Sequence, residues 1–426
     1  SEHATNHPAA GEDYSARLFA GLAANPDVYA KTALILNYDE GGQFFDHAFT
    51  PTPPLTDAEG VSTVDTENEI NRETLLPDGV DAAPNGLGYR VPLLIISPWT
   101  RGNIVYSEVT DHVSVIKFLE KRFDIACPNL SPWRRAMVGD LTAAFDFEST
   151  PDYSWPTLPD TSDYTRKADA ECLTLPDIVV PTEQSMPKQE PGTRISRALP
   201  YTFLVTGGVT DDKLSFKIDN TGTQGAPFVL FDVANNADVD PKQYAVEGGK
   251  SITHEVTLES NSDSSYSYFL YGPNGFVRSW TGSTKTTPLL SVHMEYDEAN
   301  DSVTIVATGE GKADIVDNAY GLDTVSVAGG ESATIDTSAS GNWYDFSVAG
   351  QRFMGRMETG KDGISDPAMA AGVPGLWQKN EQHPPLEEHL RVVKRSEHNG
   401  AKKQATQAHK DALFDVSPEG ILEALA

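Results

Sequence analysis

Two short apolar runs set the strongest limit on what the first part of this sequence can fold into. Residues 33–38 begin with ALIL and predict a buried strand, and residues 91–99, VPLLIISPW, form a continuous apolar run typical of a strand covered on both faces. A helix is predicted from residue 11 to the NPD at 25–27, and another over residues 110–125. Helices that alternate with strands in this way predict an α/β layout, and we expect a parallel sheet.

The second predicted helix has clear start and packing signals. Thr110 is the expected N-cap. The apolar residues at helical spacing are expected to form the buried stripe: Val115, Ile116, Leu119 and Phe123. The segment before it, residues 50–88, is rich in Pro, Thr and Asp and predicts a loop.

The sequence pattern changes after about residue 175. A proline-rich stretch without apolar period indicates a linker. From Tyr201 onward, short segments such as LSFKIDN and PFVLFDV alternate polar and apolar residues, which is typical of an antiparallel β-sandwich. YDEANDSV, residues 296–303, predicts a hairpin turn. The predicted units are an α/β part at 1–185, a linker at 186–197, antiparallel β-sandwich domains at 198–283 and 284–360, and a polar, partly helical tail at 361–426.

Charge and composition exclude some classes of function. The 426 residues carry 62 acidic and 32 basic side chains, a net charge of −30. Such a protein repels phosphate backbones and anionic membranes, so we expect no nucleic-acid partner. The sequence has no run of about 18 apolar residues, so it predicts no membrane span. Cys127 and Cys172 fit either one disulfide or two free thiols.

Two adjacent carboxylates follow the first predicted strand. Asp39 and Glu40 stand where an open α/β sheet binds ligands, and a carboxylate in such a place is costly unless it is paired, hydrogen-bonded or bound to a cation. Hard divalent cations prefer carboxylate oxygens, so a metal site is one interpretation. The alternative is that both residues cap a turn before Gly41 and Gly42.

Three other residues are candidates with structural alternatives. His47 follows an acid shortly after the first strand, and histidines in such places are more often hydrogen-bonded for structural reasons. Asp111 and His112 open the second helix, where the helix dipole favours an acid in any case.

Long composite motifs give a further indication. SEHATNHP begins the sequence and precedes a helix, and the strand that follows ends in YDEGGQFFDHAFTPTPP. A second block runs GLGYRVPLLIISPWTRGNIVYSEVTDHVSVIKFLEKRFDI. Both blocks resemble the bacterial phosphoesterase family of phosphocholine-preferring phospholipases C and related acid phosphatases, within the alkaline-phosphatase-like superfamily. ALPYTFLVTGG and DNAYG resemble the paired C-terminal β-domains of its phospholipase C branch, and the likeness covers residues 1–368.

The resemblance implies a chemistry and roles for named residues. Members attack phosphorus with a metal-assisted Ser or Thr nucleophile. Asp39 and Glu40 would then be ligands of one divalent metal ion, and His3 would be catalytic, neutralising or protonating the departing group. His47, Asp111 and His112 would support the site. The resemblance also implies a secreted or periplasmic enzyme.

The sequence departs from the family in one large respect. It has no match to the Glu-Asn metal ligands or to the nucleophile that the family places before the SEH element, and ENEINRE at 67–73 is only a chance echo. The resemblance therefore implies that residues 1–185 are the C-terminal half of a catalytic domain. The N-terminal half would come from the same precursor or from a partner chain, and this chain alone would be inactive. Smaller departures are Ala4 in place of Pro and the glycine spacing in DEGGQF.

We therefore expect the C-terminal portion of a phospholipase C-like phosphodiesterase that acts on phospholipids of the phosphatidylcholine type. One alternative is a non-catalytic module whose β-domains bind lipid, glycan or a partner protein. Another is an acid phosphatase that acts on phosphomonoesters, although such members lack the tandem β-domains.

Overall fold

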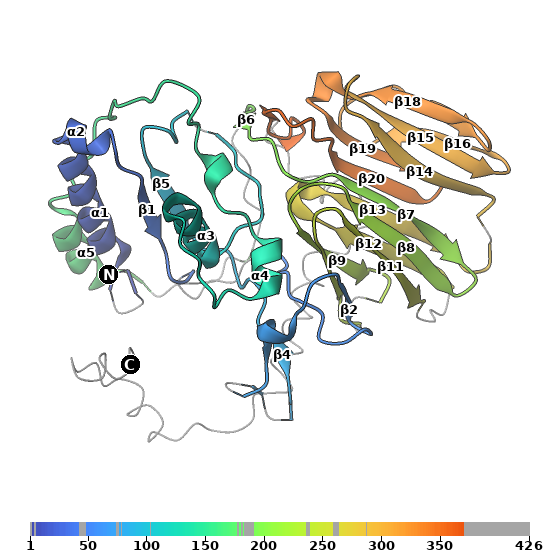
Figure 1. Cartoon of the computed structure of the whole chain (residues 1–426), viewed down its shortest axis with the longest axis horizontal. Helices are drawn as coiled ribbons and strands as arrows, with labels where there is room; N and C mark the ends of the chain where they lie inside the picture. Colours follow the sequence, from blue (N-terminus) through green and yellow to red (C-terminus); the bar gives the residue numbers. More distant parts are fainter. Residues whose placement is uncertain are drawn as a thin grey trace.

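The computed structural model describes residues 2–3, 6–41, 48–73, 76–77, 79–102, 104–176, 179, 182, 191–235, 239–258, 264–286 and 288–369. An α/β part lies at one end of the molecule and the β sheets lie at the other (Figure 1). None of the described helices is long and apolar enough to cross a bilayer. Both cysteines are free thiols, Cys127 half-buried and Cys172 exposed.

The α/β part contains the helices and strands that the sequence predicted. The first helix ends before the predicted NPD stop, and the helix–strand–strand–helix order is confirmed. The elements are α1 (Pro8–Ala23), α2 (Pro26–Tyr29), β1 (Leu34–Asn37), β5 (Leu93–Ile96), α3 (His112–Phe123), α4 (Pro132–Met137), η2 (Thr142–Ala144) and α5 (Tyr164–Cys172).

Strands β1 and β5 pair antiparallel, so the expected parallel sheet is wrong for this pair. Leu34 lies opposite Ile96, and Asn37 lies opposite Leu93. A continuous apolar run reports that a strand is buried, and it does not report the direction of the neighbouring strand. Burial is also incomplete, since Leu94 of β5 is 42% exposed.

Helix α3 begins one residue later than predicted. Its N-cap is Asp111 and not Thr110. The Asp111 carboxylate accepts a hydrogen bond from Val113 N (2.9 Å), while Ser114 Oγ accepts one from Asp111 N (3.1 Å). This reciprocal capping box satisfies amide groups that a helix start otherwise leaves unpaired. The predicted buried stripe is wrong in this structure, because its outer residues are exposed: Ile116, Leu119 and Phe123.

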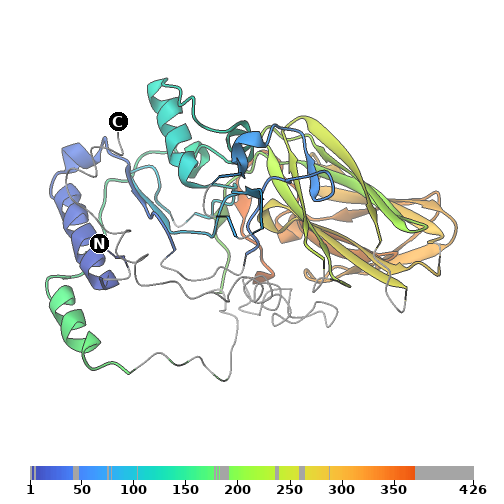
Figure 2. The same cartoon turned by 90° about the horizontal axis from the view of Figure 1, so that it is seen from below.

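The β part is built on one sheet of nine strands, in the order β17-β16-β19-β20-β13-β12-β9-β10-β2, whose last member is β2 (Gly60–Ser62). Two three-stranded sheets, β11-β8-β7 and β14-β15-β18, complete the layers, which Figure 2 shows away from α1 and α5. The strands are β7 (Phe203–Thr210), β8 (Lys213–Asn220), β9 (Ala226–Asp232), β10 (Lys242–Val246), β11 (Lys250–Thr257), β12 (Ser265–Tyr271), β13 (Val277–Ser283), β14 (Leu290–Asp297), β15 (Ser302–Gly309), β16 (Lys312–Asp317), β17 (Val325–Ala328), β18 (Ser332–Asp336), β19 (Trp343–Val348) and β20 (Gln351–Arg356), with the short helices η3 (Pro273–Gly275) and η4 (Ser338–Ser340).

The two predicted β blocks share the nine-stranded sheet. Strand β13 of the first block pairs antiparallel with β20 of the second, with Val277 opposite Met354. Each block still has its own apolar core, one around Phe216 and one around Phe346. The predicted hairpin at 296–303 is confirmed, because β14 and β15 pair across it.

Short strands within the predicted loop at 50–88 connect the two parts of the molecule. Strand β2 (Gly60–Ser62) pairs in parallel with β10, so the α/β part adds a strand to the large sheet. Gly60 has φ +146°, and a Cβ there would lie 1.7 Å from the carbonyl oxygen of Gln243. Only glycine allows this approach. The same segment holds η1 (Glu67–Glu69), β3 (Ile70–Asn71) and β4 (Ala83–Pro84).

The end of the predicted linker is also ordered. Strand β6 (Ile195–Ser196) pairs antiparallel with β21 (Gly363–Ile364), which lies at the start of the predicted tail. Residues 370–426 of that tail lie outside the described residues, so its predicted helical content stays a prediction.

Candidate functional site

The YDE motif forms an exposed turn at the end of β1. Asp39 and Glu40 are both exposed, and the Asp39 carboxylate accepts a hydrogen bond from the amide of Glu40 at 3.1 Å. This hydrogen bond is the one expected of a carboxylate that organises a turn. Both side chains face solvent, so the carboxylate oxygens that are not bonded within the turn are solvent-accessible.

The SEH element lies at the same end of β1. Burial, together with a hydrogen bond to Glu2, raises the pKa of Tyr38, which precedes Asp39 in the turn. Glu2 also fills the space beside Gly11 of α1, where a Cβ would lie 2.1 Å from its carboxylate. His3 follows Glu2 and is exposed, and its carbonyl oxygen accepts a hydrogen bond from Asn6 N at 2.7 Å.

His112 brings the start of α3 to this turn. Its Nε2 lies 2.8 Å from the carbonyl oxygen of Tyr38. A carbonyl can only accept, so Nε2 carries the proton and donates it, which leaves Nδ1 as the acceptor nitrogen in the neutral ring. The structure therefore brings four predicted residues to one region at the end of β1: His3, Asp39, Glu40 and His112.

Asp111 has a different environment from its neighbour. Its side chain is 5% exposed and forms an ion pair with Arg134, in addition to capping α3. Arg134 also holds the buried Glu69, at 2.7 Å from Nη2 to Oε2. Sequence reasoning missed Glu69 and Arg134, because 65 residues separate them and no spacing pattern marks the pair. Asp111 thus fixes the start of α3. The remaining predicted residue, His47, lies outside the described residues.

The described residues supply only part of a metal site. No group of three His, Cys, Asp or Glu side chains among them is arranged to hold an ion. Divalent cations such as Ca²⁺ and Mg²⁺ take six or more oxygen ligands, and two exposed carboxylates are too few. These residues do not make a complete site on their own, so we derive no chemical step through a metal.

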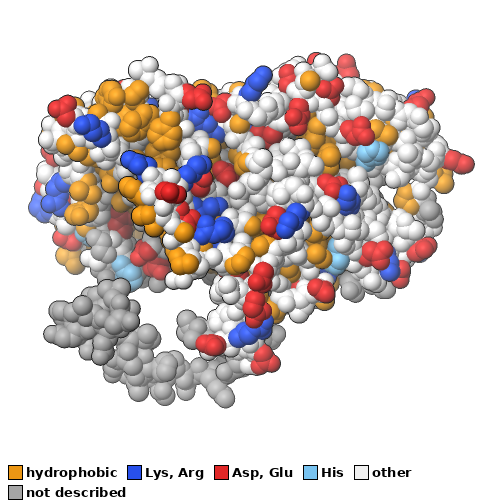
Figure 3. Space-filling model, in the orientation of Figure 1, with side chains coloured by type: hydrophobic (Ala, Val, Ile, Leu, Met, Phe, Trp, Pro, Cys, Tyr) orange, Lys and Arg blue, Asp and Glu red, His pale blue; other side chains and the backbone are white. Residues whose placement is uncertain are grey.

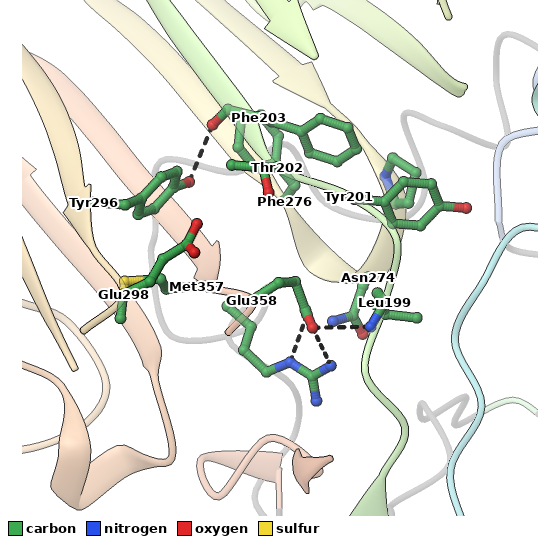
Figure 4. A pocket seen from close by; sticks show the side chains of 12 residues that line it. Leu199, Tyr201, Thr202, Phe203, Asn274, Phe276, Tyr296, Glu298, Met357 and Glu358 are labelled. Carbon is green, nitrogen blue, oxygen red and sulfur yellow. Dashed lines mark hydrogen bonds and ion pairs between the residues drawn. The ribbon is translucent and has the colours of Figure 1, made fainter. Parts of the chain in front are cut away.

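A cavity elsewhere in the molecule serves packing. It lies where the two β blocks meet, and Figure 4 shows two sets of its polar groups bonded to one another. Tyr296 donates a hydrogen bond to the carbonyl oxygen of Phe203 (3.1 Å), and Glu358 accepts from Arg356 Nε and from Leu199 N. Because these groups are paired, they are not available to a substrate.

Comparison with known proteins finds similarity for two segments of the chain. Residues 1–126 match the Phosphoesterase family, and residues 195–283 match the C-terminal domain of bacterial phospholipase C. The chain therefore carries a segment similar to the phosphoesterase family, followed by one similar to the C-terminal domain of bacterial phospholipase C. The matched segment 1–126 contains the SEH element, the YDE turn and α3.

Several bacterial relatives align with most of the chain. A non-hemolytic phospholipase C of Burkholderia pseudomallei is 41% identical over 400 residues, which cover 87% of this chain and 55% of the relative. A non-hemolytic phospholipase C of Pseudomonas aeruginosa is 38% identical, with 87% and 57% covered, and a hemolytic phospholipase C of the same species is 34% identical over 421 residues. The chain therefore spans about half the length of the curated relatives it matches.

Proposed function

We propose that this chain is the C-terminal portion of a phospholipase C-like phosphodiesterase that hydrolyses phospholipid head groups of the phosphatidylcholine type. The observation that carries the proposal is the meeting of the SEH element, the YDE turn and the start of α3 at one end of β1. Its relatives named phospholipase C support the reaction class. The match of residues 195–283 to a phospholipase C domain favours a phospholipase over an acid phosphatase.

The proposed roles follow the position of each side chain. Asp39 and Glu40 contribute carboxylate oxygens to one divalent cation. The other ligands of this cation come from the rest of the domain, which also supplies the Ser or Thr nucleophile. Such a cation polarises a phosphoryl oxygen when it is bound. His3 is exposed beside the turn and can donate a proton to the leaving oxygen.

His112 and Asp111 act as positioning residues in this proposal. The His112 Nε2 proton holds the carbonyl group of Tyr38, and so fixes the turn that carries Asp39. Asp111 holds the first turn of α3 by its cap and its ion pair with Arg134. We further propose secretion or a periplasmic location, as the family resemblance implies.

Reconstitution tests the function. Residues 1–426 would be mixed with the part of the Burkholderia relative that this chain does not cover, and hydrolysis of p-nitrophenyl phosphorylcholine, phosphatidylcholine vesicles and p-nitrophenyl phosphate would be measured. We expect diester hydrolysis by the mixture and none by either part alone. Hydrolysis of the monoester alone would support an acid phosphatase instead. Vesicle binding without any hydrolysis would support a non-catalytic module.

A further inference from the structure

Helix α4 lies between α3 and the first β block, which is the unit of residues 198–283 (Figure 1). Two fully buried side chains of α4, Trp133 and Met137, pack against Ala245 of β10. Gly225, just before β9, comes so close to α4 that a Cβ there would lie 2.5 Å from the carbonyl oxygen of Ala136. The α/β part and the first block are therefore in tight contact along α4.

Gln224 of the first block caps the C-terminus of α4. The last carbonyl groups of a helix have no partner within the helix. The side-chain amide of Gln224 donates two hydrogen bonds at this end, to the carbonyl oxygens of Ala136 (2.6 Å) and Val138 (3.2 Å). Lys117 of α3 donates to the same Val138 oxygen. One carbonyl group thus receives hydrogen bonds from the first block and from α3.

The loop that carries Gln224 is itself held firmly. Asn220 is fully buried, and its side-chain amide donates to the carbonyl oxygens of Gln224 (2.8 Å) and Val246 (3.1 Å). The Asn220 side-chain oxygen accepts a hydrogen bond from Gly222 N at 3.1 Å. Groups fixed in this way hold a neighbouring structure more precisely than groups on an unsupported loop. Gln224 therefore offers its donors to α4 from a fixed backbone.

The side chains of α4 hold the start of α3. Arg134 forms an ion pair with the buried carboxylate of Asp111, which caps α3. The next residue, His112, donates to the carbonyl oxygen of Tyr38 at 2.8 Å, and Asp39 follows in the turn. Direct contacts therefore lead from the first block, through α4 and the start of α3, to the YDE turn.

We propose that the first β block positions the YDE turn for catalysis, and that Gln224 is a positioning residue that acts on the turn through α4. Its hydrogen bonds fix the C-terminus of α4, and α4 in turn holds the start of α3 through Arg134. The inference rests on the proposed function, in which the carboxylates of the turn hold a cation. It gives a role in the reaction to the segment that matches the C-terminal domain of bacterial phospholipase C.

A lipid-binding role for the first block fits these observations less well. In Figure 3, apolar side chains gather over the half of the molecule that carries α1, β5 and α3, and they are scattered over the β part. Among the described residues of the two β blocks, the exposed large apolar side chains are aliphatic and belong to the second block: Leu289, Val316 and Val325. Proteins that lie on a membrane surface bury an exposed apolar face in it. The described part of the first block presents no such face.

The first experiment measures kcat and KM for p-nitrophenyl phosphorylcholine in the reconstituted protein. Gln224→Met keeps the length of the side chain and removes both donors to α4. We expect kcat to fall about 10-fold while KM changes less than about twofold, because small displacements of catalytic groups slow the reaction without removing a substrate contact. Thr223→Met is the matched control, since Thr223 is an exposed neighbour in the same loop, and it should leave both constants unchanged. Near-UV circular dichroism checks that each variant is folded.

A second variant disturbs the same contact by another route. Gly225→Ala leaves Gln224 in place but adds a Cβ that would overlap the carbonyl oxygen of Ala136. We expect kcat to fall in this variant as well. A folded Gly225→Ala protein with unchanged kcat would contradict the proposal.

Hydrogen exchange on residues 1–426 alone tests the positioning without any turnover. Gln224→Met should speed amide exchange at residues 38–40 and 112–115, and Thr223→Met should not. If the reconstituted protein hydrolyses nothing while exchange responds in this way, the proposed function fails and the positioning of the turn stands. An active protein in which Gln224→Met alters neither kcat nor exchange overturns the inference and leaves the function standing. A fall in kcat without faster exchange, or a loss of activity on phosphatidylcholine vesicles but not on the soluble substrate, also overturns it.

Discussion

Replacing Arg134 with methionine removes the cation that holds two buried carboxylates. Arg134 donates to Glu69 through Nε (3.0 Å to Oε1) and Nη2 (2.7 Å to Oε2), and its Nη1 contacts Asp111. The side chains of Glu69 and Asp111 are only 6% and 5% exposed. Methionine keeps much of the side-chain volume, so the substitution tests charge more than packing.

We expect the free energy of unfolding of the α/β part to fall by about 3–5 kcal/mol, the range measured when one partner of a buried ion pair is removed. The assay is urea denaturation followed by tryptophan fluorescence, since Trp133 is fully buried next to Arg134. Arg17→Met is the matched control, because Arg17 is 71% exposed and pairs with Asp13 at 3.1 Å. Exposed pairs contribute less than about 1 kcal/mol.

If Arg134→Met and Arg17→Met lowered the free energy of unfolding by the same amount, this reasoning would be refuted. A second step sharpens the test: adding Glu69→Gln to Arg134→Met removes one of the stranded charges, so part of the lost stability should return. No recovery would mean that Arg134 acts through packing.

Three further predictions concern proton linkage and the joint between the two parts. Hydrogen bonds from Arg135 hold the pKa of Glu120 down to about 2, so its contribution to stability is present above the usual carboxyl pKa and is lost as the pH falls toward 2. The urea concentration at the unfolding midpoint should therefore fall less steeply on acidification in Glu120→Gln than in the unaltered protein. Burial raises the pKa of Glu108, so its stabilising, protonated form is lost as the pH rises through that raised value. Glu108→Gln should raise the Tm at pH 8 more than at pH 4, and equal shifts at both would contradict this. Gly60→Ala should break the β2–β10 pairing, because the added Cβ would overlap the carbonyl oxygen of Gln243. Limited proteolysis near residue 60 should then be faster, and an unchanged cleavage rate would contradict this prediction.

Local signals predicted individual elements well. The NPD sequence marks the end of α1, and the run at 91–99 marks β5. The N-cap of α3 was misplaced by one residue because Thr110 and Asp111 are both good caps, and the choice between them depends on the side-chain hydrogen bonds of the folded helix.

Long-range pairing was beyond the reach of sequence patterns. The alternation in β13 and β20 shows that each is a strand, but nothing local specifies that they pair and join two blocks in one sheet. The same holds for β2, whose three residues lie in a stretch with the composition of a loop. The helical spacing also placed Ile116, Leu119 and Phe123 of α3 in a core, although periodicity identifies a packing face without identifying its partner.

For the site, the motif located the region, but the contacts assigned the individual roles. Asp111 and His112 are neighbours in sequence, yet one is buried in an ion pair and the other is exposed and bonds to Tyr38. That division depends on Arg134, which no local pattern connects to the helix start.

The central claim is that the strand end at Asp39 contributes to phosphodiester hydrolysis. The most direct test is kcat/KM for p-nitrophenyl phosphorylcholine in the reconstituted protein, with Asp39→Ala compared to Asp323→Ala, an exposed acid of the β part. We predict that Asp39→Ala lowers kcat/KM at least about 100-fold. Loss of a group that only hydrogen-bonds to a metal ligand already costs up to about 100-fold in activity, and loss of the ligand itself should cost no less. Asp323→Ala should leave it unchanged. An Asp39→Ala protein with the same kcat/KM as the control would contradict the account.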